Sequence, residues 1–79
     1  MILRRSAFKY GIAEADSVEA ASWPQFTAPL DDEHPQRELR LGFDTHGRLL
    51  ELVVLVWDDG TEEIIHSMKA RKKYLDLLP

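Results

Sequence analysis

The segment from Arg48 to Trp57 constrains the fold most, because it is apolar on both sides of a β-strand. Alternate positions on one side hold Leu50, Leu52, Val54 and Val56, and those on the other hold Leu49, Val53, Leu55 and Trp57. A strand that is apolar on both faces is covered on both sides by other parts of the protein. We therefore expect residues 48–57 to form the central strand of a sheet, although the acidic Glu51 interrupts the apolar run.

The segments on either side of this strand also have the features of strands. The Asp58-Asp59-Gly60 turn predicts a tight hairpin into residues 61–68, because an Asp-Gly pair accepts the positive φ angles of such turns. Residues 38–43 alternate between polar and apolar side chains, which is typical of a strand with one buried face. Residues 25–30 contain Pro29 and are at best an edge strand.

Helices are expected near both ends of the chain. Residues 6–10 predict a short helix that ends at Gly11, and residues 13–21 predict a second helix that ends before Pro24. Residues 70–78 predict a last helix. The predicted fold class is α+β: two N-terminal helices, a three- to four-stranded antiparallel sheet and a C-terminal helix.

Composition places the chain among small globular proteins. A length of 79 residues predicts one domain, residues 1–79, and the 44% hydrophobic and 30% charged content argues against disorder. No apolar run approaches the roughly 20 residues that span a bilayer, and the N-terminus lacks the pattern of a secretory signal. Because the chain also lacks cysteine, we expect a cytoplasmic protein without disulfides and without a membrane partner.

Charge is distributed unevenly along the chain. The net charge is −4, but the first ten residues hold Arg4, Arg5 and Lys9 and no acid. The end of the chain is basic as well, through Lys69, Arg71, Lys72 and Lys73. If the two ends meet in the fold, they form one positive surface that suits a polyanion or an acidic partner. If they do not meet, they are two solvated surfaces.

Several kinds of site are not expected. The four glycines are isolated, so no phosphate-binding loop is predicted, and no histidine pair has metal-ligand spacing. The acidic segment 31–34 lacks the alternating ligands of a calcium loop and is predicted to be a solvated loop. We therefore expect no cofactor and no metal.

The basic C-terminal segment is the candidate site. Ile64, His66 and Met68 are expected to share one strand face, with Lys69 and Arg71 at the corner that follows. RNA cleavage requires a base for the 2′-hydroxyl proton, cations for the charged phosphorane and an acid for the leaving oxygen. We therefore predict His66, Lys69 and Arg71 as catalytic residues. The residues predicted to bind RNA are Arg48, Lys72, Lys73 and Tyr74. The alternatives are a structural histidine and a solvated cluster of cations.

The chain resembles the small BrnT-like toxins of bacterial type II toxin–antitoxin systems, within the RelE/ParE-like superfamily. The features that carry the resemblance are, in chain order, Phe8-Lys9-Tyr10-Gly11-Ile12, the acidic helix that ends at Pro24, Leu30-Asp31-Asp32, the run from Arg40 to Glu51, and Ile65-His66-Ser67-Met68-Lys69-Ala70-Arg71. The resemblance covers nearly the whole chain and implies a RelE-like fold. It also implies a metal-independent endoribonuclease that inhibits translation, and places Lys69 and Arg71, with Arg48 as a second candidate, toward the RNA.

The implied partners are RNA, which could be ribosome-associated, and a cognate antitoxin protein. DNA would be contacted only through the antitoxin. The alternative is a non-catalytic interaction module that binds a partner protein, and a weaker one is a structural domain whose basic ends are merely solvated.

Overall fold

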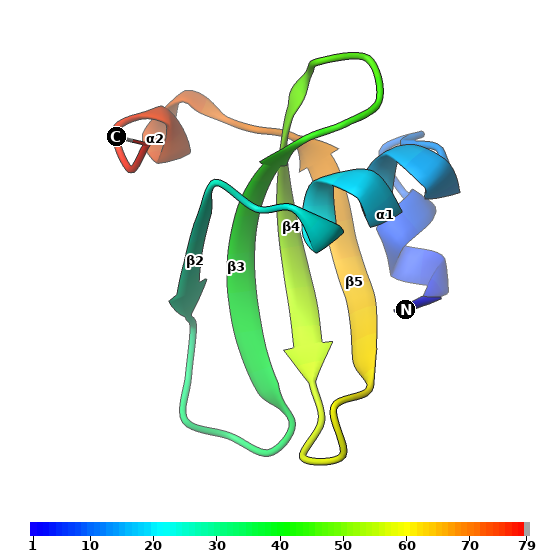
Figure 1. Cartoon of the computed structure of the whole chain (residues 1–79), viewed down its shortest axis with the longest axis vertical. Coiled ribbons are helices and arrows are strands. Elements are labelled where there is room, and N and C mark those ends of the chain that lie inside the picture. Colours follow the sequence, from blue (N-terminus) through cyan, green and yellow to red (C-terminus); the bar gives the residue numbers. More distant parts are fainter. Residues whose placement is uncertain (79) are drawn as a thin grey trace.

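Strand β4 (Leu49–Val56) lies at the centre of a five-stranded sheet in the computed structural model, which describes residues 1–78 (Figure 1). The strand order is β1-β5-β4-β3-β2. The other strands are β1 (Ile2–Leu3), β2 (Phe26–Pro29), β3 (Gln36–Phe43) and β5 (Glu62–Lys69). The pairs β2–β3, β3–β4 and β4–β5 are antiparallel, whereas β1 runs parallel to β5, so the sheet is mixed.

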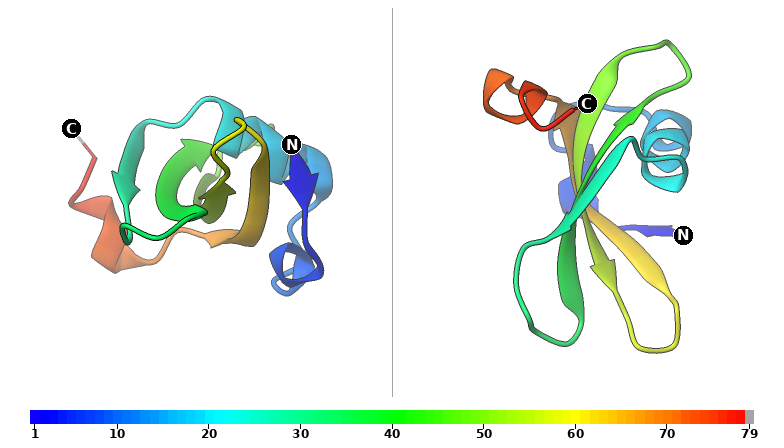
Figure 2. Two further views of the ribbon diagram at one scale, coloured as in Figure 1. Left: turned by 90° about the horizontal axis from the view of Figure 1, so that it is seen from below. Right: turned by 60° about the vertical axis from the view of Figure 1, so that its left-hand side comes forward.

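Only one helix is longer than a single turn among the described residues. Helix α1 (Glu14–Ser22) crosses one face of the sheet, and η1 (Arg5–Phe8) is one turn of 3₁₀ helix that contacts β5. Helix α2 (Lys72–Leu75) is one turn long and lies on the opposite side of the sheet from α1 (Figure 2).

The predicted fold class is wrong, because it expected two N-terminal helices, an antiparallel sheet of at most four strands and a C-terminal helix of residues 70–78. The strands expected at 38–43, 48–57 and 61–68 lie where β3, β4 and β5 are found. Strand β1 was missed because two residues are too few to show a period. Helix α2 is short because nothing caps it and its turn is basic, whereas cations oppose the dipole at a helix start.

Helix α1 covers the first face of the sheet, which we define by the β4 side chains Leu50, Leu52 and Val54. These three side chains are fully buried together with Ala20 and Ala21 of α1. The close contact requires Gly42 of β3, since a Cβ there would lie 2.9 Å from the carbonyl carbon of Ala20 and closer still to its oxygen. The second face carries Glu51, Val53 and Leu55 of β4, and it is the side on which α2 lies.

A β-bulge in β5 changes the side on which its later residues lie. Ile64 pairs with Val54 and His66 pairs with Val53, so Ile65 has no partner on β4. In regular pairing Ile64 and His66 would share a face, as the sequence predicts. With the bulge, Ile64 is buried on the first face, whereas His66 and Met68 lie on the second face. The expectation that the three share a face is therefore wrong.

The N-terminal segment supports this bulge. The backbone N–H of Arg4 donates to the Ile64 carbonyl at 3.0 Å, and the Ser6 hydroxyl donates to the Ile65 carbonyl at 2.5 Å. These contacts give both backbone oxygens next to the bulge a hydrogen-bond partner. The first residues of the chain therefore help to hold His66 on the second face.

Candidate functional site

A buried carboxylate, Glu51, organises the second face. Its side chain is 1% exposed and accepts hydrogen bonds from two residues. Arg71 donates its backbone N–H and Nε to Oε1 at 3.0 and 2.9 Å, and its Nη2 to Oε2 at 2.8 Å. The His66 Nε2 lies 3.1 Å from Oε2. Glu51, His66 and Arg71 thus form one hydrogen-bonded cluster.

The cluster keeps Glu51 ionised. Burial raises the pKa of Glu51, but the hydrogen bonds from Arg71 and His66 more than offset this, so the pKa lies below its usual value. The Arg71 pKa is raised in turn, chiefly by its hydrogen bond to Glu51. A carboxylate and a guanidinium in this arrangement fix each other's position, as bidentate pairs do.

The ionised Glu51 also determines which nitrogen of His66 is available. A carboxylate only accepts hydrogen bonds, so a neutral His66 carries its hydrogen on Nε2 and leaves Nδ1 as an acceptor. The imidazole is 24% exposed, and Nδ1 has no hydrogen-bond partner among residues 1–78. His66 therefore presents an unoccupied base on a partly open surface.

Two tyrosines flank the cluster. The Tyr10 ring packs edge-on against the His66 ring, with 5.6 Å between centroids and 77° between planes. On the other side, the Tyr74 ring centroid lies 5.6 Å from the Arg71 guanidinium. Lys9 Nζ lies 5.5 Å from the Tyr10 centroid, and Lys73 Nζ lies 4.9 Å from the Tyr74 centroid. Both end segments of the chain therefore contribute a ring to this cluster, Tyr10 beside His66 and Tyr74 beside Arg71.

A hollow of about 310 Å³ opens beside the cluster, between α2 and the sheet. Its apolar lining comes from Leu30, Val53 and Ile65, and its polar lining comes from Arg37, Glu51, His66, Arg71 and Tyr74. The hollow therefore combines an apolar surface with the imidazole and two guanidiniums.

The structure brings together His66, Arg71, Lys73 and Tyr74 of the predicted site residues. It places Lys69 elsewhere, because Lys69 pairs with Leu50 and so lies on the first face, opposite His66. Arg48 is engaged in the turn before β4, where its Nε donates to Asp44 at 2.6 Å. Lys72 is exposed on α2 without a described contact to the cluster.

Sequence reasoning missed Glu51 and Tyr10 as members of the site. A charge inside an otherwise apolar central strand was the available signal for Glu51, since such a charge is rarely buried without a partner. Tyr10 carried no comparable signal. Its place beside His66 depends on the pairing of β1 with β5.

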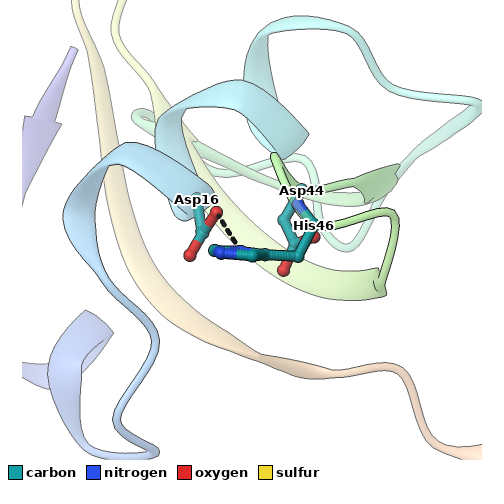
Figure 3. Close-up of side chains that lie close together, drawn as sticks. All are labelled: Asp16, Asp44 and His46. Atoms are coloured by element: carbon teal, nitrogen blue, oxygen red, sulfur yellow. Dashed lines mark hydrogen bonds and ion pairs between the residues drawn. The ribbon is translucent and has the colours of Figure 1, made fainter.

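A second polar cluster lies on the other side of the sheet, where Asp16, Asp44 and His46 come close together (Figure 3). Asp16 of α1 accepts hydrogen bonds from Thr45, and His46 Nδ1 lies 3.2 Å away. Asp44 accepts from the backbone N–H groups of His46 and Arg48 at 2.8 and 2.9 Å. Because these carboxylates are already occupied, the cluster ties α1 to the β3–β4 turn.

The buried carboxylates predict a loss of stability in acid. The hydrogen bond from Thr45 lowers the pKa of Asp16. Burial raises the pKa of Asp44, but hydrogen bonds from Arg48 and His46 bring this pKa below its usual value. The pKa of Glu51 is lowered against the effect of burial in the same way. A lowered pKa in the folded state stabilises it at pH values above the unfolded-state pKa, here 3.8 for Asp and 4.5 for Glu. This stabilisation is lost as the pH falls toward the lowered values.

We therefore expect the free energy of unfolding in urea to be smaller at about pH 3 than at about pH 7. In Asp44→Asn this difference between the two pH values should shrink, while in the exposed control Asp32→Asn it should stay as in the wild type. An undiminished difference in Asp44→Asn would contradict the stabilising role of the Asp44 carboxylate.

No helix in residues 1–78 is long and apolar enough to cross a membrane. Comparisons with protein-family models, with curated proteins and with solved structures give no match to this chain.

Proposed function

We propose that the protein is a metal-independent endoribonuclease that acts on RNA in the cytoplasm, as the toxin of a type II toxin–antitoxin pair. The observation that carries the proposal is the Glu51–His66–Arg71 cluster, with Tyr10 and Tyr74 beside it. The resemblance to BrnT-like toxins supports the same activity.

The cluster supplies the groups that RNA cleavage needs. His66 Nδ1 accepts the proton of the 2′-hydroxyl, and the 2′-oxygen then attacks the neighbouring phosphorus. Arg71 stabilises the added negative charge through Nη1, which has no hydrogen-bond partner among the described residues. The bond to the 5′-oxygen breaks, and that oxygen takes a proton from the Tyr74 hydroxyl. The products are a 2′,3′-cyclic phosphate and a 5′-hydroxyl.

Glu51 acts on this reaction through His66 and Arg71. Its carboxylate holds the imidazole in one tautomer and compensates the positive charge that His66 gains when it takes the proton. It also fixes Arg71 at the corner after β5. In this role Glu51 is a positioning residue.

Induced expression in a bacterial host tests the proposal. We expect growth arrest together with new RNA 5′-hydroxyl ends, and we expect both to disappear in Arg71→Ala. Lys69→Ala is the matched control, because it removes a cation from the opposite face and should leave the arrest intact. Normal growth and intact RNA, with wild-type protein in the soluble fraction, would contradict the proposal.

A second candidate function is an interaction module that binds a partner protein without cleaving RNA. It is favoured by a hollow of about 610 Å³ along α1, on the side away from His66, which Val18 and Trp23 line with Glu14 and Glu19. Trp23 is 72% exposed, and exposed aromatic residues are frequent anchors of protein interfaces. The two carboxylates suit a basic, partly apolar segment of an antitoxin.

The two candidates differ in what they predict for RNA. Binding of an antitoxin segment by the α1 hollow is compatible with both functions, whereas new RNA ends after induction occur only with the first. Two results together would favour the interaction module. The wild-type protein would leave RNA intact, and it would bind a partner that Trp23→Ala no longer binds.

A further inference from the structure

We propose that the ligand of the second face is an unpaired RNA dinucleotide. One base would enter the 310 Å³ hollow against Tyr74, the next base would stack on Tyr10, and the phosphate between them would lie at His66. The identity of the ligand as RNA rests on the proposed function. The unpaired state and the two base positions are new.

The order of side chains across the face supports this assignment. Contacts run from Lys9 to Tyr10, from Tyr10 to His66, through Glu51 to Arg71, and on to Tyr74 and Lys73. An aromatic ring with a cation beside it therefore occurs on each side of the imidazole. Alternating rings and cations are typical of proteins that bind single-stranded nucleic acid.

The two rings differ in their surroundings. Tyr10 is 46% exposed, so its ring remains available for a base on the surface. Tyr74 is less exposed and lines the hollow together with the apolar side chains of Val53 and Ile65. The apolar faces of a base fit against such a lining, and Arg37, which also lines the hollow, supplies donors for the polar edge of the base.

The hollow favours an unpaired ligand. A base can enter it only when its edges are not paired and its faces are not stacked on neighbouring bases. In an RNA duplex the bases stay inside the helix, and only the phosphates and 2′-hydroxyls could reach Arg71 and the lysines. The geometry therefore predicts that pairing weakens binding at this site.

The test uses a fluorescent oligonucleotide of about six 2′-O-methyl ribonucleotides, offered as a single strand and as a duplex with its complement. The methyl group removes the proton that cleavage requires, so binding is measured without turnover. We expect the single strand to bind the wild-type protein at least about 10-fold more tightly than the duplex. Tyr10→Ala and Tyr74→Ala should each weaken single-strand binding by about 5-fold or more.

Matched variants separate stacking from other effects. Tyr10→Phe and Tyr74→Phe keep the ring and should bind the methylated strand within about 2-fold of the wild type. Trp23→Ala removes an exposed aromatic side chain from the α1 side and should leave binding unchanged. Thermal unfolding of each variant checks that the fold is retained.

Three results would overturn the inference. They are equal affinity for the single strand and the duplex, no binding of either, and wild-type affinity in both alanine variants of folded protein. If the alanine variants bind the methylated strand more weakly but the wild-type protein leaves unmethylated RNA intact, the inference stands and the proposed cleavage is contradicted. Cleavage of RNA that is unaffected by Tyr10→Ala would contradict the inferred base position at Tyr10 and leave the proposed cleavage intact.

Discussion

Replacement of His66 by alanine is expected to lower RNA cleavage by about 100-fold or more, the range over which a positioned general base contributes. The reason is that Nδ1 of His66 is the free acceptor of the cluster, because Glu51 holds the other nitrogen. The rate of cleavage of a labelled, unmethylated RNA measures the effect. The matched control is His34→Ala, which removes an exposed histidine that contacts Asp58 outside the cluster.

Two further measurements distinguish catalysis from structure at His66. Binding of the methylated single strand should change much less than cleavage in His66→Ala, since base stacking and Arg71 remain. Glu51→Gln should also slow cleavage, because an amide can present its NH₂ group to Nε2 and so no longer fixes the tautomer. Wild-type cleavage in folded His66→Ala would remove His66 from the mechanism and leave it a structural role.

Gly42→Ala is expected to lower the free energy of unfolding by about 3 kcal/mol, the upper end of the usual cost of overpacking, because the neighbouring atoms cannot move aside. The added Cβ would lie 2.9 Å from the carbonyl carbon of Ala20 and would overlap its oxygen. Both are backbone atoms, so no side-chain rotation relieves the contact, and α1 must lift away from β3. Urea unfolding monitored by circular dichroism measures the loss.

Gly47→Ala is the control for this substitution. Gly47 has a φ of +78°, and a methyl group added there would meet no heavy atom within 4 Å, so alanine costs only the backbone strain of about 1–2 kcal/mol. If Gly42→Ala were no more destabilising than Gly47→Ala, α1 would not pack as closely on β3 as the contact with Ala20 requires.

The strands could be predicted from the sequence because their signals are local. The apolar run in β4 and the alternation in β3 reflect which side chains are buried on each face, and these patterns repeat within a few residues. The helices could be predicted less well. The segment expected as a C-terminal helix of residues 70–78 has only one helical turn, since a basic, uncapped turn has little to stabilise it.

The position of Glu51 in the site could not be predicted, because it depends on the pairing of strands that are distant in the sequence. His66 and Arg71 were recognisable as a histidine beside cations, but their partner Glu51 lies 15 and 20 residues away along the chain. Only the register of β4 against β5 brings these groups together. Lys69, which looks equivalent to Arg71 in the sequence, lies on the other face for the same reason.

The basic C-terminal segment, the central apolar strand and the hairpin after it were determined by the sequence alone, because composition and short-range periodicity specify them. The tertiary structure decided which side chains face one another. The two-residue strand β1 and the bulge at Ile65 have no periodic signal, yet they bring Tyr10 beside His66 and turn His66 away from the core. One unpaired residue places every later side chain of the strand on the opposite side of the sheet. The composition of the site therefore depends on the strand pairing.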